Sequence, residues 1–389
     1  MYTIKTMNAI SPVGLAKLPA NQFEINNEAN DAQGILVRSA DLHDVALPKS
    51  LLAIARAGAG TNNIPIDQCT EQGIVVFNTP GANANAVKEL VLCALFLTSR
   101  KIAPALDWVK TLKGQGDQVE KLIEKGKGQF AGPEIQGKAL GVVGLGAIGI
   151  LVANAASQLG MEVYGYDPYL SVEHAWRLSS AVHLSPSLDE VYQKCDYITL
   201  HLPQTKDTKG MVNGESLQKM KDGVRILNFA RGALVDTDAL LEALGQGKVA
   251  AYATDFPADA MLGVEGVVAL PHLGASTPES EDNCAVMAVD QMKDYLENGN
   301  IAHSVNYPAC SMGKARAASR IACLHANVPN MIGQITAILA KDNANVQRMT
   351  NESAGENAYT MFDTDEHLNS STIEALKQIP SMYRVRVIK

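Results

Sequence analysis

The segment LGVVGLGAIGILVANAASQLGMEVYGYDPY, residues 140–169, decides the fold of the middle of the chain. It carries Gly144-x-Gly146-x-x-Gly149 directly after an apolar run and at the start of a helical stretch, and a second apolar run ends at Asp167. In this strand–helix–strand context, the glycines let a pyrophosphate approach the backbone, and the helix start offers free N–H groups. The segment therefore favours a dinucleotide site over a glycine-rich turn that binds nothing.

Asp167 also predicts which dinucleotide binds. A carboxylate at the end of the second strand accepts hydrogen bonds from the adenosine ribose hydroxyls and repels a 2′-phosphate. Pro168 and Tyr169 follow it, so no basic residue stands there to receive a phosphate. The predicted cofactor is NAD, not NADP.

Short apolar runs alternate with helical stretches along most of the chain. Continuous apolarity is typical of parallel strands covered on both faces, and the alternation predicts a doubly wound α/β architecture. We expect strands within 34–39, 51–58, 73–79, 139–146, 161–167, 195–203, 225–231, 249–256 and 266–272.

The pattern changes after Ser319. Glycine-, lysine- and proline-containing breaks at 125–140 and 306–319 indicate boundaries. Beyond the second break the expected order is β-α-β-β-α-β, which is the ferredoxin-like pattern. Its strands are expected at 320–327, 344–353, 357–365 and 382–389, and its helices at 330–342 and 370–380.

Composition limits the class of protein. The 389 residues are 47% hydrophobic and 19% charged, as in soluble globular proteins of two or three domains. The net charge of −8 argues against nucleic acid or a membrane surface as partner. The six cysteines form no metal-binding or disulfide pattern, and no segment predicts a signal peptide or membrane span. We expect a soluble cytoplasmic protein without a metal, acting on a small molecule.

Two ionisable residues end apolar runs downstream of the glycine motif. Arg231 follows such a run in LNFARGALVD, and His272 closes GVVALPH. Carboxyl ends of parallel strands meet at the ligand-binding edge of an open sheet. There a guanidinium can grip a carboxylate and an imidazole can carry a proton. Either residue alone is explained as an ordinary strand-end side chain. Together with the glycine motif they predict hydride transfer at a hydroxyl or carbonyl carbon.

These motifs together resemble the D-isomer-specific 2-hydroxyacid dehydrogenases. GLGAIG, YDPY, HLPQTKDTKGMVNGESLQKMKDG, NFARGALVD and PHLGAST stand in the family's order and spacing over roughly residues 35–308. PHLGAST and ENGNIAHSVNYP resemble the branch that oxidises 3-phosphoglycerate. The segment after Ser319 resembles an ACT regulatory domain.

The resemblance implies three domains. A Rossmann-type nucleotide domain at 94–282 is inserted in a flavodoxin-like substrate domain at 1–93 and 283–310, and an ACT domain follows at 319–389. It also implies NAD-dependent oxidation of D-3-phosphoglycerate by a homodimer or homotetramer. The alternatives are another D-2-hydroxyacid dehydrogenase, acting on hydroxypyruvate or glyoxylate, and an NAD-sensing binding protein of the same fold.

By resemblance Arg231 and His272 are catalytic and also contact substrate. The implied cofactor contacts are Gly144, Leu145, Gly146, Ala147, Ile148, Gly149, Asp167, His201, Leu202, Pro203, Thr208, Ala230, Arg231, Asp255, His272 and Gly274.

Further substrate contacts are implied before the nucleotide domain. Arg38 and Ser39 match residues that hold the substrate phosphate. The backbone around Ala59 and Gly60 matches a loop that receives the carboxylate, and Asn83 matches another contact.

One segment departs from the family pattern Asp-Val-Phe-x-x-Glu-Pro, in which the Asp meets the nicotinamide amide and the Glu pairs with the catalytic histidine. Here the text is YATDFPADAM. Aligned on Phe256, the Asp position falls on Thr254 and the Glu position on Asp259. The nicotinamide contact is therefore Asp255 or Thr254, and Asp259 either supports His272 as a catalytic residue or is a solvated loop acid.

In the ACT-like segment, His325, Asn327 and Asn345 match positions that bind serine in regulated relatives. We expect His325 and Asn327 on a strand-to-helix loop, with Asn345 entering the next strand and all three converging at one edge. L-Serine is the implied effector, bound between the ACT-like domains of two subunits whose outer strands pair, and a domain that serves only assembly is the alternative.

Overall fold

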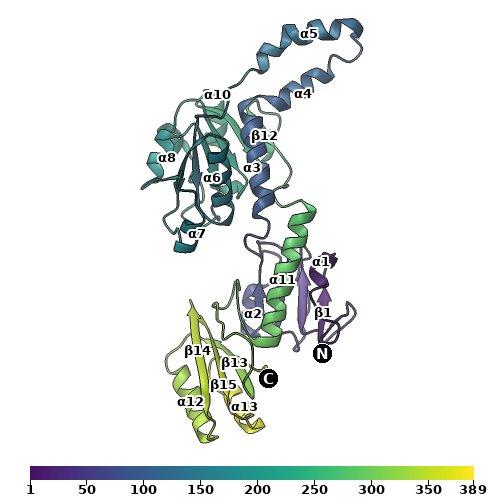
Figure 1. Cartoon of the computed structure of the whole chain (residues 1–389), viewed down its shortest axis with the longest axis vertical. Helices are drawn as coiled ribbons and strands as arrows, with labels where there is room; N and C mark the ends of the chain where they lie inside the picture. Colours follow the sequence, from purple (N-terminus) through teal and green to yellow (C-terminus); the bar gives the residue numbers. More distant parts are fainter. The chain divides into compact units, whose positions relative to one another are not determined.

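The computed structural model describes all 389 residues and divides into two compact units (Figure 1). Unit 1 combines Met1–Ala82 with Pro278–Lys389, and unit 2 is Asn83–Thr277. The predicted boundaries at 93/94 and 282/283 lie inside helices α3 (Ala84–Ser99) and α11 (Pro278–Asn298). The chain therefore passes between units at the starts of these helices.

Unit 2 is built on a seven-stranded parallel sheet of order β12-β11-β10-β9-β6-β7-β8. The order reverses at β6, the strand before the glycine motif, as a doubly wound fold requires. The strands are β6 (Ala139–Val143), β7 (Glu162–Tyr166), β8 (His183–Leu184), β9 (Tyr197–Leu200), β10 (Val224–Asn228), β11 (Val249–Thr254) and β12 (Val267–Ala269). All are confirmed except β8, which was not predicted because two exposed residues leave no apolar run.

Most helices of unit 2 cover its sheet, and two further helices project away from it. The helices are α3, α4 (Ile102–Lys110), α5 (Val119–Gly126), α6 (Ala147–Gln158), α7 (Val172–Trp176), α8 (Leu188–Lys194), α9 (Gly214–Lys219) and α10 (Thr237–Gly245). Two apolar clusters fill the unit, one including residues of α3 and α6 and the other residues of α8 to α10. Helices α4 and α5 bury no residue and extend away from the sheet (Figure 1).

The first sheet of unit 1 has the parallel order β2-β1-β3-β4-β5. This is the flavodoxin-like order expected for the substrate domain. Its elements are β1 (Tyr2–Thr6), α1 (Pro12–Leu15), β2 (Phe23–Ile25), β3 (Gly34–Val37), β4 (Ala53–Arg56), α2 (Ile66–Glu71) and β5 (Val75–Phe77). Strands β1 and β2 were missed because each buries a single side chain, Ile4 or Phe23, and neither shows a continuous apolar run.

The C-terminal segment confirms the ferredoxin-like pattern. Its antiparallel sheet has the order β14-β15-β13-β16. The elements are β13 (Ser319–Ala326), α12 (Met331–Lys341), β14 (Val346–Ala354), β15 (Asn357–Thr364), α13 (Ser370–Lys377) and β16 (Met382–Val387).

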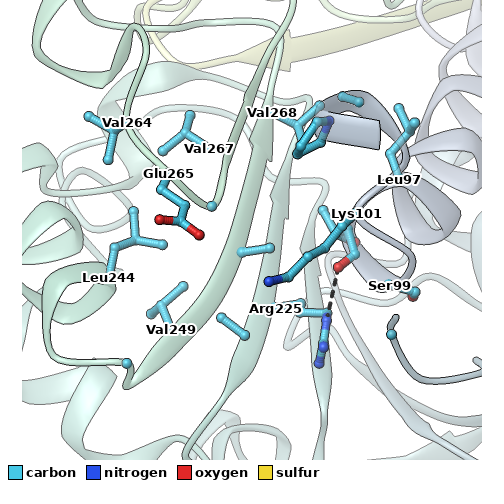
Figure 2. Close-up of a pocket in the computed structure, with 18 of the residues that line it drawn as sticks. Leu97, Ser99, Lys101, Arg225, Leu244, Val249, Val264, Glu265, Val267 and Val268 are labelled. Atoms are coloured by element: carbon cyan, nitrogen blue, oxygen red, sulfur yellow. Dashed lines mark hydrogen bonds between the residues drawn. The ribbon is translucent and has the colours of Figure 1, made fainter. Parts of the chain in front are cut away.

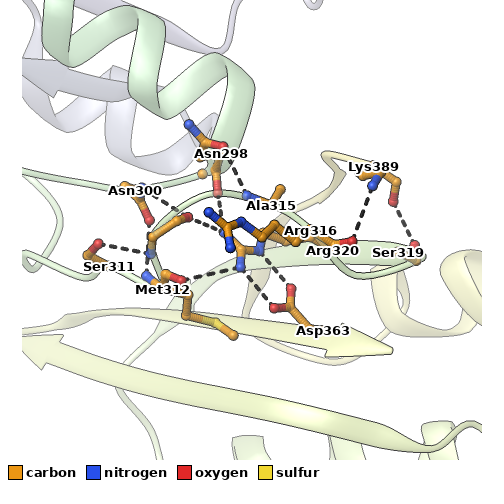
Figure 3. Close-up of polar contacts among 12 residues, drawn as sticks. Asn298, Asn300, Ser311, Met312, Ala315, Arg316, Ser319, Arg320, Asp363 and Lys389 are labelled. Atoms are coloured by element: carbon orange, nitrogen blue, oxygen red, sulfur yellow. Dashed lines mark hydrogen bonds and ion pairs between the residues drawn. The ribbon is translucent and has the colours of Figure 1, made fainter. Parts of the chain in front are cut away.

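Arg320 on β13 ties this sheet to the segment that precedes it. Its buried guanidinium donates two hydrogen bonds to the Asp363 carboxylate, at 2.7 and 2.8 Å. It also donates to the main-chain oxygens of Asn298 and Gly313 (Figure 3). Arg320 therefore holds the end of α11, the linker and the ACT-like sheet together.

The last strand also returns to the first. Arg386 on β16 donates to the main-chain oxygens of Tyr295 and Leu296 on α11 and to the Tyr2 hydroxyl. One apolar cluster contains side chains of both sheets of unit 1, for example Phe77 and Tyr359. The ACT-like sheet is thus packed into unit 1.

All six cysteines are free, and all but Cys93 are buried. No helix has the length and apolar character needed to cross a bilayer.

Candidate nucleotide and catalytic site

The glycine loop is shaped by close packing on one side and open on the other. Gly144 has φ of 93°, and a Cβ there would lie 2.6 Å from the main-chain oxygen of His201. A Cβ on Gly149 would lie 1.9 Å from the oxygen of Gly144. A Cβ on Gly146, the N-cap of α6, would meet no atom within 4 Å. The first and third glycines are therefore required for packing, and the space at the second is open to a ligand.

Asp167 lies against this loop. Its carboxylate accepts hydrogen bonds from the backbone N–H of Leu145 at 2.8 Å and of Tyr169 at 2.9 Å. The Leu145 side chain is fully buried in the core, and its N–H is engaged by Asp167. Ala147 and Ile148 begin α6, where backbone N–H groups lack helical partners.

The loop after β9 contains the next predicted contacts. His201 approaches Gly144 through its backbone and exchanges a 2.9 Å hydrogen bond with the Thr199 hydroxyl. Burial lowers the pKa of His201 to about 3, so its ring is neutral near pH 7. Thr208 donates to the main-chain oxygen of Pro203 at 2.7 Å and fixes this loop, which also contains Leu202.

Arg231 follows β10 on a loop organised by Asn228. The buried Asn228 amide donates to the Arg231 oxygen at 2.9 Å and accepts from the N–H groups of Ala230 and Arg231. The guanidinium is exposed and donates to the Ala230 oxygen at 2.6 Å. Asn228 was not predicted as a site residue, although its place at the strand end, three residues before Arg231, was visible in the sequence.

His272 lies three residues beyond β12, and its ring packs against the ring of Phe256 in a tilted arrangement. The ring centroids are 4.5 Å apart at 48°, and the Arg231 guanidinium lies 6.0 Å from the centroid of the same phenyl ring. Phe256 therefore brings the predicted arginine and histidine to one aromatic side chain.

The sequence does not decide the roles of one threonine and two aspartates near these loops. Thr254 is fully buried, and its hydroxyl donates to the Asn228 oxygen and accepts from the Phe256 N–H. Asp255 is also buried and accepts from the Gly274 N–H at 2.9 Å, whereas its Oδ1 has no partner. Asp259 begins a short 3-10 turn, is exposed, and makes no hydrogen bond to His272.

In unit 1, the predicted phosphate and carboxylate contacts lie at the carboxyl ends of β3 and β4, which are neighbours. Arg38 pairs with Glu281 of α11 at 2.7 Å. The Asn8 side chain accepts from the N–H groups of Arg38, Ser39 and Ala40 and shapes their loop, a role that was not predicted.

The second loop of this edge contains Ala59 and Gly60. The Asn78 amide donates to the Ala59 oxygen at 2.6 Å. Asn83 belongs to unit 2, where it is the N-cap residue of α3 and makes no side-chain cap hydrogen bond.

The predicted serine residues do not converge within one chain, and this part of the prediction is wrong. His325 lies in β13 rather than on a loop, is buried, and engages both ring nitrogens, with the Ala326 oxygen and the Thr360 hydroxyl. Burial lowers the pKa of this imidazole. Asn327 follows the end of β13, where its amide donates to the Gly355 oxygen.

Asn345 lies at the opposite end of the same sheet. It precedes Val346, which pairs with Thr364, and Thr364 in turn pairs with Ser319 at the start of β13. Six strand residues separate that end from His325, about 20 Å at 3.3 Å per residue. The physical reason is that α12 returns the chain to the starting edge before β14 begins.

A cavity of about 720 Å³ lies at the amino ends of strands in the unit 2 sheet (Figure 2). Its lining includes Arg225, Val249 and Val267, at the amino ends of β10, β11 and β12, together with Leu97 and Lys101. The predicted catalytic and cofactor residues instead follow the carboxyl ends of these strands, so this cavity is a separate feature.

Comparison with known proteins identifies the family. Residues 92–274 match the D-isomer specific 2-hydroxyacid dehydrogenase NAD binding domain. D-3-phosphoglycerate dehydrogenase of Haemophilus influenzae is 30% identical over 88% of this chain and 82% of that protein. The NAD+-bound 3-phosphoglycerate dehydrogenase of Entamoeba histolytica superimposes with a TM-score of 0.61 at 26% identity, over 78% of this chain and 98% of that one. A glyoxylate reductase from Paecilomyes thermophila gives 0.64 at 25%, with the same coverage.

The matching segment spans between 52% and 60% of the length of seven other curated D-3-phosphoglycerate dehydrogenases, at 34% to 36% identity. The glycine loop, the arginine and histidine at the strand ends, and these matches agree. The chain belongs to the D-isomer specific 2-hydroxyacid dehydrogenase family.

Proposed function

We propose that the protein oxidises D-3-phosphoglycerate to 3-phosphohydroxypyruvate with NAD, the first step of L-serine synthesis. The observation that carries the proposal is the placement of Arg231 and His272 on one phenyl ring, at the sheet edge that also bears the open glycine loop. The Haemophilus influenzae and Entamoeba histolytica relatives named for this activity support the substrate.

The residues at the glycine loop fit NAD. The space at Gly146 and the free N–H groups at the start of α6 suit a pyrophosphate, and Asp167 suits ribose hydroxyls. The buried Oδ1 of Asp255 lacks a donor, which the nicotinamide amide would supply, whereas the Thr254 hydroxyl is fully engaged. We therefore favour Asp255 as the nicotinamide contact. NAD, when bound, supplies the acceptor for the hydride.

His272 and Arg231 then divide the remaining chemistry. The exposed imidazole of His272 accepts the proton of the substrate hydroxyl. The Arg231 guanidinium, held through its backbone by Asn228, binds the carboxylate and stabilises charge on the developing carbonyl oxygen. Asp259 contributes nothing to this step in our proposal, because it does not contact His272.

The loops after β3 and β4 would receive the ends of the substrate. The Arg38 guanidinium has N–H groups beyond the one that meets Glu281, and the Ser39 hydroxyl is a further phosphate donor. The N–H groups around Ala59 and Gly60 would receive the carboxylate. We also propose that the chain consists of the substrate, nucleotide and ACT domains named above. We propose a cytoplasmic location for the protein.

Serine regulation, if it uses Asn327 and Asn345, requires two chains. Strand β14 is the outer strand at one edge of its sheet, and its residues are mostly exposed, whereas Arg384 of the other edge strand contacts the main chain of Lys49 and Leu51. Antiparallel pairing of two β14 strands around a twofold axis would bring Asn345 of one chain near the partner's Asn327. We therefore propose a homo-oligomer that binds L-serine between two ACT-like sheets.

A second surface, on unit 2, also suits contact with another copy of the chain. The projecting helices α4 and α5 bury no residue, and Leu106 and Val109 are exposed on α4. The cavity beside Lys101 and Arg225 adjoins the start of this projection (Figure 2). A homodimer through this face and a tetramer through both faces are consistent with these features.

A substrate panel followed by NADH absorbance tests the function. We expect reduction of 3-phosphohydroxypyruvate at a kcat/KM about tenfold or more above that of hydroxypyruvate or glyoxylate, because only the first offers a phosphate to Arg38. Equal or better turnover of glyoxylate or hydroxypyruvate would favour the reductase alternative, which the Paecilomyes thermophila likeness supports. NADH binding without turnover of any of the three would favour an NAD-sensing protein.

A further inference from the structure

Three consecutive residues contact the loops of Arg231 and His272. They are Thr254, the last residue of β11, and Asp255 and Phe256, which follow it. Each uses a different kind of interaction and a different partner. The exposed fraction of Thr254 is 0% and that of Asp255 is 2%. Both side chains therefore make their contacts away from solvent.

Thr254 supports the arginine loop. Its hydroxyl donates to the main-chain oxygen of Asn228 at 2.9 Å, and Asn228 holds the backbone of Arg231 through both ends of its amide. The same hydroxyl accepts from the Phe256 N–H at 3.0 Å. One buried hydroxyl therefore fixes the backbone of Phe256 relative to the loop of Arg231.

Asp255 supports the histidine loop. Its Oδ2 accepts from the N–H of Gly274, two residues after His272, at 2.9 Å. A Cβ on Gly274 would lie 3.2 Å from this oxygen, so the two loops are in close contact. Burial raises the pKa of the Asp255 carboxyl, while the Gly274 N–H and the nearby His272 oppose that rise.

Phe256 completes the connection with its ring. The centroid of the His272 imidazole lies 4.5 Å from the centroid of the phenyl ring, and the Arg231 Cζ lies 6.0 Å from the same centroid. His272 is exposed, and its ring contact with Phe256 is tilted at 48°. An aromatic ring attracts a cationic group over its face and favours offset or tilted contacts with a second ring.

We propose that Thr254, Asp255 and Phe256 form a positioning unit that sets the spacing of Arg231 and His272. Phe256 places the two reacting side chains, while Thr254 and Asp255 anchor the loops that carry them. The inference rests on the proposed function for the roles of Arg231 and His272 and for the choice of substrate in the assay. It predicts that changes at Thr254 and Phe256, neither of which is assigned to the cofactor, lower kcat while cofactor binding is retained.

The decisive variants differ by one group each. Phe256→Leu removes the ring and keeps an apolar side chain, and Phe256→Tyr keeps the ring. Thr254→Val removes both hydrogen bonds at nearly constant shape, and Thr254→Ser keeps the hydroxyl. Tyr164→Leu is the matched control, because Tyr164 is also partly buried and its ring also packs against an imidazole, that of His183, in the same unit.

We expect Phe256→Leu and Thr254→Val to lower kcat by about tenfold or more, since small misplacements of reacting groups cost that much or more. The Kd for NADH should stay within about twofold, and Phe256→Tyr, Thr254→Ser and Tyr164→Leu should retain most activity. In histidine-labelled protein, the His272 ring resonance should shift in Phe256→Leu and not in Tyr164→Leu, which removes the ring beside His183 instead.

Two results would overturn the proposal: folded Phe256→Leu and Thr254→Val proteins with kcat near wild type, or a His272 resonance unmoved by Phe256→Leu. If Phe256→Leu does not fold, Thr254→Val against Thr254→Ser decides. Each protein is assayed with 3-phosphohydroxypyruvate and with hydroxypyruvate. Wild-type activity on the second substrate alone refutes the proposed substrate and leaves the positioning test intact, and activity on neither refutes both.

Discussion

The nucleotide sheet and the ACT-like sheet distribute their candidate ligand residues in opposite ways. In unit 2 the glycine loop, Arg231 and His272 follow the carboxyl ends of parallel strands, and all lie at one edge. In the ACT-like sheet Asn327 follows a strand and Asn345 precedes one, and they lie at opposite ends.

The difference follows from chain direction. A crossover helix carries the chain back, so successive parallel strands end at the same edge and start at the other. Residues that all end strands therefore meet, whereas one that ends a strand and one that starts the next parallel strand cannot. Motifs on parallel strands are brought together only if they stand at equivalent ends of those strands.

The largest effect is expected from a substitution of His272, at the edge of unit 2 where the candidate ligand residues meet. His272→Asn should lower kcat by about 10²–10⁴-fold, because it removes the group that accepts the hydroxyl proton. NADH binding, measured by fluorescence titration, should be nearly unchanged because the glycine loop is intact. A kcat close to wild type would show that His272 is an ordinary strand-end residue.

Arg231→Lys tests the second residue of that edge. A lysine keeps the charge but cannot make two parallel hydrogen bonds to a carboxylate, so KM should rise and kcat should fall together. The loss of a charged hydrogen bond corresponds to about 1.5–3 kcal/mol, or roughly 10- to 100-fold in kcat/KM. A variant that differs from wild type only in melting temperature would make Arg231 structural.

Asp167 tests the cofactor preference at the same edge of the sheet. We expect kcat/KM with NADH to exceed that with NADPH by about tenfold or more, because the carboxylate repels a 2′-phosphate. Asp167→Ala should narrow this ratio, chiefly by weakening NADH binding. Comparable use of both cofactors by the wild-type protein would contradict the assignment.

Serine inhibition tests whether two chains can join what one chain separates. A typical coupling of about 1–3 kcal/mol predicts at least severalfold inhibition by L-serine. Asn327→Ala and Asn345→Ala should each abolish it, and Gln378→Ala, at an exposed amide elsewhere in the domain, should not. Mixed oligomers of the two asparagine variants should recover partial sensitivity, because one of their interface sites retains both amides.

If millimolar serine neither inhibits the protein nor raises its melting temperature, the ACT-like segment serves assembly or another effector. Removing the whole segment is a poor control, since its side chains complete the apolar cluster of unit 1.

The smallest effect is expected at Asp259. If Asp259 stabilised a protonated His272, Asp259→Asn would move the acid limb of the kcat/KM profile to lower pH. Because Asp259 is exposed and does not contact His272, we expect no shift and nearly wild-type turnover. A clear downward shift would restore Asp259 as the partner of the histidine.

Sequence patterns were sufficient for the parts of the fold that bury continuous apolar runs. Strands such as β6 and β10 were predicted because every or nearly every residue is buried. The glycine motif was specific because its spacing is dictated by backbone approach. Strand β2, with one buried residue, carries no comparable signal.

The supporting residues of the site were beyond sequence reasoning for a different reason. Asn228, Thr254 and Phe256 act through contacts across neighbouring strands, and these depend on register. The choice between Thr254 and Asp255 likewise required knowing that β11 ends at Thr254 and that Asp255 meets Gly274. His325 was misplaced because its strand extends one residue beyond it, which engages the ring inside the sheet.

The contact between Arg386 and Tyr2, 384 residues apart, has a consequence for biosynthesis. Unit 2 is continuous in sequence and can fold as soon as it has been synthesised, but β1 to β5 must wait for α11 and β16 to cover them. During that interval their apolar strands can pair with those of another nascent chain. Refolding at high concentration should therefore trap exchanged unit 1 segments, and dilution should rescue unit 1 more than unit 2.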